Sequence, residues 1–307
     1  MSVVASIPKQ RYLRVIPVAF LMYTIAFVDR NNIGLAIPSM SAKLHFSPTV
    51  SGLAFGIFFI GYLILQVPGG HLAERWSAKW FVFVALLVWG VLSSITGLVQ
   101  NVEQLLIVRF LLGVAEGGVW PATLVLLAHW FPRRERARAN SLWILCLPFA
   151  SAVSSPISGW ILSVTGSDYR ILFLAEGAPA IVWAALWAIF IKDHPHQSNA
   201  ISPAERDYLD RTLREERADR DRPDLGTYRK AMTSPFTWLF CLIYFFSTIP
   251  GYGISSFYPS LLKQTGMSIG VVGWVNALPY VMAIIGLLVV GVVSDRSMVR
   301  RRWVAIP

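Results

Sequence analysis

The feature that most constrains this chain is a series of eight apolar stretches, each long enough to cross a membrane as a helix. A helical span needs about 20 consecutive, mostly apolar residues. Of the 307 residues, 55% are apolar and 14% are charged, whereas soluble domains average roughly 25% charged. The sequence therefore predicts an all-α polytopic membrane protein. The stretches are Val15–Ile37, Val50–Gly70, Trp80–Gln100, Gln104–Ala128, Asn140–Val164, Ile171–Ile191, Pro235–Ser260 and Ile269–Val293.

The positive charges are distributed unequally between the two sets of connecting segments. One set, which includes both termini and the long central segment, holds 22 of the 27 Lys and Arg residues; the other holds three, Lys43, Arg170 and Lys263. Positive residues concentrate on the cytoplasmic side of membrane proteins. We therefore expect a multi-pass protein of the cell (inner) membrane with a cytoplasmic N-terminus. Because the basic residues flank the membrane, we expect no nucleic-acid partner.

An internal repeat indicates two related halves. Gly70 is followed four residues later by an acid and then by Arg, and Gly291 begins the same pattern 221 residues further on. This predicts a six-helix N-terminal bundle over 1–191, a cytoplasmic central loop over 192–234, and the start of a second bundle over 235–307. Since the second half has only two stretches, we expect a chain shortened at its C-terminus.

The acid–arginine pairs of this repeat have two readings. They are Glu74 with Arg75, and Asp295 with Arg296. They are either helix caps and orientation signals, or a cytoplasmic latch that forms in one access state and breaks in the other. Because the pattern occurs at equivalent places in the two halves, we favour the latch.

The central loop contains one predicted helix. Ser202-Pro203-Ala204-Glu205 has the pattern of a capping box with proline at the first helical position, so we expect a short helix from Pro203 to Ala218. His194 and His196 in the same loop are spaced like metal ligands but lack a third ligand. We therefore predict no metal site.

Charged residues within the apolar stretches are the strongest functional signal. Asp29 and Arg30 lie in the first stretch, and Arg109 and Glu116 lie in the fourth. Each costs roughly 2.5–3.5 kcal/mol on insertion scales. At about 1.5 Å per residue, Asp29 and Arg109 lie at similar depth, and Arg30 reaches toward Glu116. We therefore expect two ion pairs, Asp29 with Arg109 and Arg30 with Glu116. They either join the two helices permanently or, as we favour, couple the movement of a proton and an anion.

Further polar side chains interrupt the apolar stretches. Tyr62 either lines a cavity or packs between helices. Asn31 and Asn32 are candidates for a hydrogen bond to a neighbouring helix or to a substrate hydroxyl, and Asn32 is the one assigned to substrate binding. Glu176 is expected to have a structural hydrogen-bonding role. Small residues spaced four apart allow close helix approach; they are Gly52, Gly56, Gly113 and Gly117.

Taken together, these motifs resemble the major facilitator superfamily, and within it the anion:cation symporter branch that includes bacterial transporters of sugar acids, tartrate and phthalate. The resemblance runs from about Arg11 to Trp303. The motifs that carry it are Asp29-Arg30-Asn31-Asn32, Arg109 with Glu116-Gly117, Trp130-Phe131-Pro132, Pro156-Ile157-Ser158-Gly159, Glu176-Gly177-Ala178-Pro179-Ala180 and Tyr258-Pro259.

The resemblance implies alternating access by two six-helix halves around a site at the membrane midplane. It also implies proton coupling through Asp29 and Glu116, and anion binding by Arg30 with Tyr62 nearby. Arg109 is expected to act as a charge-pair and gating residue. Protons are the coupling ion and no cofactor is expected.

The predicted function is secondary active symport of a small organic anion, such as a sugar acid, with protons. Two alternatives stay open: a uniporter or exporter of the same fold, and a non-transporting, truncated membrane protein. An enzyme is not expected, because the sequence has no nucleophile–base pair, no phosphate-binding glycine loop and no catalytic metal ligands. The oligomeric state is unknown, with a monomer favoured.

Overall fold

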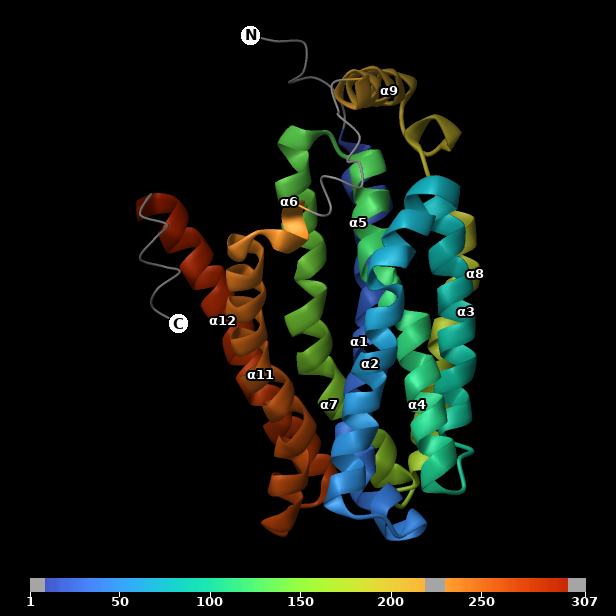
Figure 1. Cartoon of the computed structure of the whole chain (residues 1–307), viewed down its shortest axis with the longest axis vertical. Helices are drawn as coiled ribbons and strands as arrows, with labels where there is room; N and C mark the ends of the chain where they lie inside the picture. The colour runs from blue at the N-terminus through green and yellow to red at the C-terminus, as the bar shows by residue number, and fades with distance from the viewer. Residues whose placement is uncertain (1–8, 219–229, 298–307) are drawn as a thin grey trace.

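The computed structural model describes residues 9–218 and 230–297, without the side chains of residues 217, 255, 256 and 287–297. The described chain is almost entirely helical and contains no strand (Figure 1). The elements are α1 (Gln10–Leu44), α2 (Pro48–Leu72), the π-helical turn η2 (Ala73–Ser77), α3 (Ala78–Thr96), α4 (Val102–Gly117), α5 (Val119–Trp130), α6 (Arg133–Ile144), α7 (Cys146–Val164), α8 (Tyr169–Phe190), the short 3₁₀ helix η3 (Pro195–Gln197), α9 (Pro203–Ala218), α11 (Pro235–Gln264) and α12 (Ile269–Ser297).

The described residues contain seven helical stretches that are long and apolar enough to cross a membrane. One of them, Pro48–Thr96, has 49 residues and would be about 74 Å long if straight, more than twice the hydrocarbon thickness. Instead the backbone becomes extended at Ser77, with φ −172° and ψ 122°, and α3 returns beside α2 (Figure 1). This stretch has the length of two crossings, so the helices are compatible with the eight predicted spans.

The first six spans form one bundle. Within it, α2 packs along α4, α3 packs along α8, and α1 lies against both α7 and α8. Outward-facing apolar side chains such as Leu63 and Val67 are more than two-thirds exposed. A lipid environment favours such a surface, because helices satisfy their own backbone groups and need only apolar side chains outside.

Glycines allow α2 and α4 to pack closely against each other. A Cβ atom added at Gly113 would lie 2.0 Å from the carbonyl oxygen of Phe58, and one added at Gly61 would lie 2.2 Å from that of Phe110. Gly117 also contributes to this contact, as expected. The expectation for Gly52 and Gly56 was wrong, because nothing lies within 4 Å of a Cβ atom added at either. Both glycines lie on a different side of α2 from Gly61.

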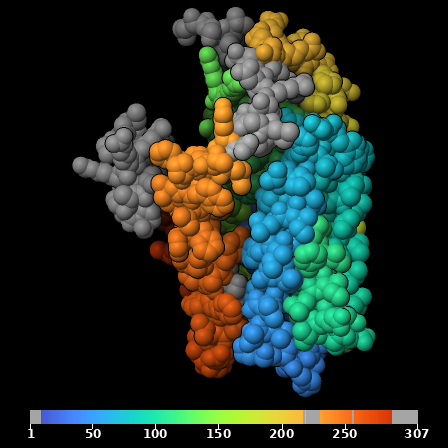
Figure 2. All heavy atoms as spheres, in the orientation of Figure 1, coloured from blue at the N-terminus to red at the C-terminus, as the bar shows by residue number. Residues whose placement is uncertain are grey.

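The two remaining long helices contact the first bundle at the end opposite α9. The side chain of Asn276 on α12 donates a 2.5 Å hydrogen bond to Ser155 on α7. On α11, the rings of Tyr252 and Phe257 pack against Phe59 and Phe55 of α2. Figure 2 shows α11 meeting α2 over its lower part, with a groove between the two helices above that contact.

The predicted loop helix is confirmed as α9, with the expected bounds Pro203–Ala218. The hydroxyl of Ser202 accepts a hydrogen bond from the backbone N–H of Glu205, which is the first half of the predicted capping box. The carboxylate of Glu205 forms different contacts. It accepts hydrogen bonds from the backbone N–H groups of Gln10 and Arg11, and so caps the beginning of α1.

Candidate functional site

The centre of the site is a buried ion pair between α1 and α4. The guanidinium group of Arg30 donates two hydrogen bonds to Oε2 of Glu116, at 2.6 and 3.1 Å. Arg30 is 7% exposed and Glu116 is 1% exposed. This is the pair that depth arithmetic predicted. The second carboxylate oxygen of Glu116, Oε1, is buried and accepts no hydrogen bond. Glu116 can therefore accept a further hydrogen bond inside the bundle.

Aromatic rings surround the guanidinium group of Arg30. The carbon at its centre lies 4.8 Å from the ring centroid of Tyr62, 5.3 Å from that of Phe27 and 5.5 Å from that of Phe58. Aromatic faces attract cations, and more strongly where water is excluded. The rings therefore add to the attraction that holds the cation at this place. Tyr62 lies close to Arg30, as the sequence predicted.

Asp29 turns away from Arg30 toward α3. Its carboxylate accepts a 2.7 Å hydrogen bond from the indole N–H of Trp89, one from the hydroxyl of Ser93, and a 3.1 Å bond from the amide of Asn32. Three donors stabilise a buried carboxylate in its ionised form. The two α3 donors, Trp89 and Ser93, were not identified from the sequence. A tryptophan or a serine on an apolar helix does not indicate which residue its side chain will contact.

The expected ion pair between Asp29 and Arg109 is not formed. Arg109 is 1% exposed, but its Nε donates a long, 3.4 Å hydrogen bond to the carbonyl oxygen of Ala54 on α2, and its guanidinium group lies over the ring of Phe58. The charges of Asp29 and Glu116 still act on it. Depth along the membrane places Asp29 and Arg109 at one level but does not determine the direction in which each side chain points.

Two cavities lie where α1 faces α11, and Arg30 lines the first of them. One is lined by Arg30, Asn31, Phe58, Arg109 and Tyr252. The other has a volume of about 290 Å³; its lining includes Asn31, Phe27 and Tyr252 together with the hydroxyl-bearing side chains of Ser151, Ser247, Thr248 and Tyr280. Asn31 and Tyr252 border both cavities, so the two are neighbours.

The structure places Asn32 away from these cavities. It is fully buried and its amide is bound to Asp29, so the asparagine that lines both cavities is Asn31. Consecutive helical residues differ by about 100° in direction, and the sequence alone did not distinguish the two.

The end of the bundle that carries α9 holds the predicted latch residues. Glu74 and Arg75 lie in η2, and both are exposed. Neither forms an ion pair with the described residues. Asp295 and Arg296 lie in the part of α12 whose side chains fall outside the described residues. The acid that contacts this turn is Asp193, which accepts hydrogen bonds from the Ser77 hydroxyl at 2.5 Å and from the Lys79 backbone N–H at 2.9 Å.

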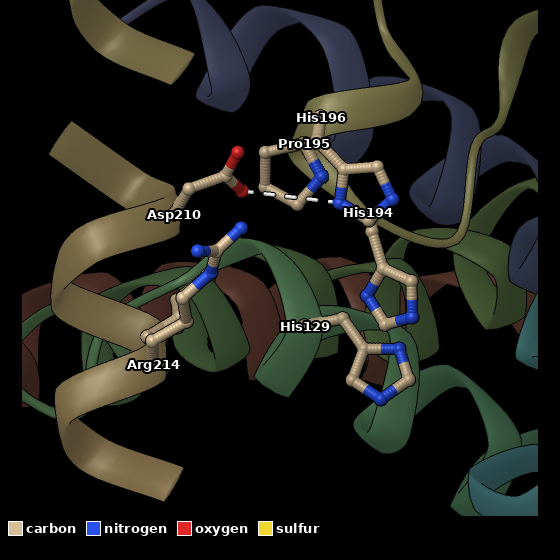
Figure 3. A pocket seen from close by; sticks show the side chains of 7 residues that line it. His129, His194, Pro195, His196, Asp210 and Arg214 are labelled. Carbon is tan, nitrogen blue, oxygen red and sulfur yellow. Dashed lines mark ion pairs between the residues drawn. The ribbon is translucent and has the colours of Figure 1, made fainter. Parts of the chain in front are cut away.

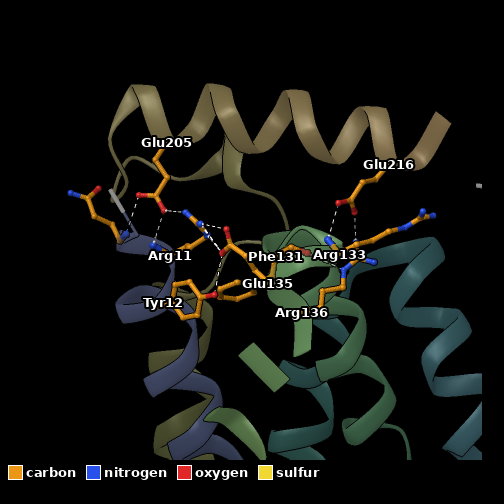
Figure 4. Close-up of polar contacts among 9 residues, drawn as sticks. Arg11, Tyr12, Phe131, Arg133, Glu135, Arg136, Glu205 and Glu216 are labelled. Atoms are coloured by element: carbon orange, nitrogen blue, oxygen red, sulfur yellow. Dashed lines mark hydrogen bonds and ion pairs between the residues drawn. The ribbon is translucent and has the colours of Figure 1, made fainter. Parts of the chain in front are cut away.

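A second ion-pair network joins α9 to the bundle (Figure 4). Arg11 is buried and pairs with Glu205 of α9 at 2.5 Å and with Glu135 of α6 at 2.7 Å. Near the other end of α9, Glu216 pairs with Arg136 at 3.1 Å. Removing one partner of a buried pair such as Arg11 with Glu205 strongly destabilises a protein. The central helix is therefore fastened at both ends to the first bundle.

Three histidines gather beside α9 (Figure 3). The ring of His129 lies 4.4 Å from that of His194, which stacks 5.4 Å from that of His196. His196 in turn lies 3.9 Å from Asp210. The sequence identified only the two loop histidines. Even with His129 added, the described residues hold no group of three or more ligands suited to a metal ion.

Among the described residues, seven helical stretches long and apolar enough to cross a membrane, with an ion pair buried between two of them, define the class of protein: a multi-pass helical membrane protein. Residues 19–306 match the family model of the Major Facilitator Superfamily. The chain belongs to this superfamily, whose members are transporters and not enzymes. This confirms the fold class and the resemblance drawn from the sequence.

Relatives within the superfamily transport organic anions or drugs, according to their names. The "Putative tartrate transporter" of Agrobacterium vitis is 32% identical over 301 residues, which cover 95% of this chain and 66% of the relative. A quinolone resistance transporter of Acinetobacter baumannii is 30% identical, covering 92% and 66%. The hexuronate transporter of Bacillus subtilis is 29% identical, covering 92% and 64%. The chain thus spans slightly less than two thirds of the length of these relatives.

Among solved structures, the fold is similar to that of a bacterial homologue of the human lysosomal transporter Spinster, in an inward-facing and unoccupied conformation. The TM-score is 0.73 at 21% identity, and the match covers 94% of this chain and 64% of that one. At this level of identity the likeness concerns the fold alone.

Proposed function

We propose that this protein takes up a small organic anion together with protons, by alternating access across the cytoplasmic membrane. The observation that carries the proposal is the buried pair of Arg30 with Glu116, in which two guanidinium N–H groups donate to one carboxylate oxygen, beside the cavity that Arg30 lines. An arginine that holds a carboxylate within the protein has the geometry to hold a substrate carboxylate instead.

The exchange of partners accounts for proton coupling. When Glu116 takes up a proton, its attraction for Arg30 falls and the guanidinium group is available to the anion. One carboxylate then replaces another, so the buried charge stays constant and the desolvation cost does not rise. Asp29, which is held by three donors, is the second proposed proton-coupling residue. Arg109 supplies further positive charge at the cavity wall.

The cavity lining favours a hydroxylated acid as the substrate class. Asn31, Ser151, Ser247 and Thr248 present amide and hydroxyl groups around the larger cavity, and these groups hydrogen-bond to substrate hydroxyls. Tartrate and hexuronates, which name two relatives, are acids of this kind. Tyr62 is proposed to orient Arg30, and Asn31 takes the substrate contact that the sequence suggested for Asn32.

The orientation and the gate are part of the proposal. The excess of positive charge at the N-terminus and the central segment supports a cytoplasmic location for α9. The groove between α11 and the first bundle then faces the cytoplasm, while the contacts of Asn276 and Phe257 close the outer end. We propose that Glu74 and Arg75, with Asp295 and Arg296, form a latch in the opposite access state.

The test is uptake of labelled sugar acids, tartrate and aromatic acids into membrane vesicles under an imposed pH gradient. We expect uptake by the wild type to follow the pH gradient and uptake by Glu116→Gln to be independent of it. We expect Arg30→Lys to reduce uptake by about 10-fold or more, since the point charge of lysine replaces the forked guanidinium group. Glu103→Gln, on the exposed first turn of α4, is the matched control. Full, pH-driven uptake by the Glu116→Gln variant would refute the coupling role.

A second candidate is export or facilitated diffusion, in which the buried charges only gate the pathway. The similarity to a quinolone resistance transporter favours retaining it. It predicts substrate flux without proton flux, which a pH-sensitive dye inside the vesicles measures directly.

A further inference from the structure

The buried charges of the spanning helices do not balance. Among side chains that the structure describes, the charged residues deep within the bundle are the cations Arg30 and Arg109 and the carboxylates Asp29, Glu116 and Glu176, each at most 7% exposed. Two cations thus face three carboxylates. If all five groups are ionised, one negative charge stays uncompensated in a region that disfavours any net charge.

Glu176 connects this excess charge to the site. It lies on α8, and α8 packs against α1 and α3. The amide side chain of Asn32 lies against its carboxyl group, and the charge of Asp29 acts on it. Because Asn32 also donates to Asp29, one residue touches both carboxyl groups. Glu176 is therefore part of the same electrostatic cluster, although neither the ion pair nor the cavities include it.

The three carboxylates differ in what stabilises their charge. Glu116 has the Arg30 guanidinium group, and Asp29 has three hydrogen-bond donors. Glu176 has one clear donor, the hydroxyl of Ser158 on α7, which is 2.6 Å from Oε1. Its Oε2 is buried and accepts no hydrogen bond, and Oδ1 of Asn32 is in the same condition. A buried acceptor without a donor is costly, and protonation converts such an oxygen into a donor.

Among the described residues of the helices that pack around Glu176, no cation acts on it. On α8 itself, Arg170 is exposed at the beginning of the helix. On α3 the ionisable side chain is Lys79, which lies at the α9 end of the helix near Asp193. On α7 it is Cys146, the first residue of that helix. On α1 the group whose charge reaches Glu176 is Asp29, and that charge is negative. None of these groups therefore supplies the positive charge that would balance an ionised Glu176, and the Ser158 hydroxyl is its one hydrogen-bond donor.

We propose that Glu176 is an additional proton-binding carboxyl group of this protein, which carries on Oε2 the proton that balances the buried cluster while Asp29 and Glu116 are ionised. This goes beyond the structural role expected from the sequence. The proton comes from the aqueous phase and returns to it, so that no bond other than O–H forms or breaks. Only the transport consequence rests on the proposed function: because the anion replaces the Glu116 carboxylate at Arg30, the buried charge stays constant and Glu176 keeps its proton throughout the cycle.

The first test is infrared spectroscopy of the purified protein in lipid, at neutral pH. A protonated carboxyl group has a carbonyl stretching band distinct from that of a carboxylate. We expect the wild type to show such a band, Glu176→Gln to lose one carboxyl equivalent of it, and the control Glu103→Gln to retain it. Identical spectra for the wild type and Glu176→Gln would overturn the proposal, whether or not the protein transports.

The same variant provides a test by stability. Glutamine is neutral and nearly isosteric with protonated glutamate, so we expect Glu176→Gln to unfold within a few degrees of the wild type. A large loss of thermal stability would contradict the proposal, because an ionised carboxylate would then be required. Sodium ions that stabilise the wild type but not Glu176→Gln, relative to choline, would also overturn it, since the balancing charge would be a metal cation.

The third test is a transport measurement. The number of protons moved per anion is obtained from the pH gradient that just halts net uptake. We expect the same count in Glu176→Gln as in the wild type. One proton fewer in Glu176→Gln would contradict a constantly held proton, because Glu176 would then release its proton in each cycle. If the wild type moves no protons at all, the proposed symport fails, while the infrared result still decides whether Glu176 holds a proton.

Discussion

Gly113→Ala is expected to lower the free energy of unfolding, although it adds only a single methyl group. The new Cβ atom would lie 2.0 Å from the carbonyl oxygen of Phe58, where contacts below 3.0 Å force something to move. The obstacle is backbone on α2, so no side chain can rotate away. The two helices must separate by about 1 Å, and overpacking of this kind costs about 1–3 kcal/mol.

The magnitude follows from two opposing terms. A backbone clash belongs at the upper end of that range, about 3 kcal/mol, while alanine is favoured over glycine within a helix by about 1 kcal/mol. The net loss is therefore about 2 kcal/mol. Gly56→Ala on α2 is the matched control, because nothing lies within 4 Å of its added Cβ atom; it gains the propensity term alone.

The assay is thermal unfolding in detergent, followed by the fluorescence of the 12 tryptophans. The two variants differ by about 3 kcal/mol, which at about 2 °C per kcal/mol separates their midpoints by about 6 °C. Gly113→Ala should also slow transport, because α4 carries Glu116 and α2 carries Tyr62. Equal midpoints for the two variants would refute the reasoning that a close backbone contact fixes the α2–α4 crossing.

Two further predictions concern the α9 end of the bundle. Asp193→Ala removes the acceptor for the Ser77 hydroxyl and the Lys79 backbone N–H, so we expect a loss of about 1–2 kcal/mol, typical of a lost cap, and a lower unfolding midpoint; an unchanged midpoint would exclude a capping role. Glu205→Gln leaves Arg11 with a single anionic partner, and breaking a buried pair costs about 3–5 kcal/mol. We expect a lower midpoint and faster proteolysis of the segment around α9, and resistance equal to that of the wild type would argue against fastening by this pair.

The order and the type of the elements could be read from the sequence. Apolar runs of about 20 residues identify spanning helices because a bilayer has a fixed thickness. Ser202 and Glu205 predicted α9 because capping depends on local chemistry within four residues. The pairing of Arg30 with Glu116 was also predictable, since it depends on depth and on the reach of a long side chain.

What the sequence left open is the direction in which each side chain points around its helix. One residue turns that direction by about 100°, so Asn31 lines the cavities while Asn32 binds Asp29. For the same reason, Gly61 rather than Gly56 packs against α4, and Asp29 accepts a hydrogen bond from Trp89 instead of pairing with Arg109. Length, hydrophobicity and spacing determine which helices form and at what depth their charges lie; helix rotation and neighbour choice, which decide what each charge contacts, emerge only when the bundle is packed.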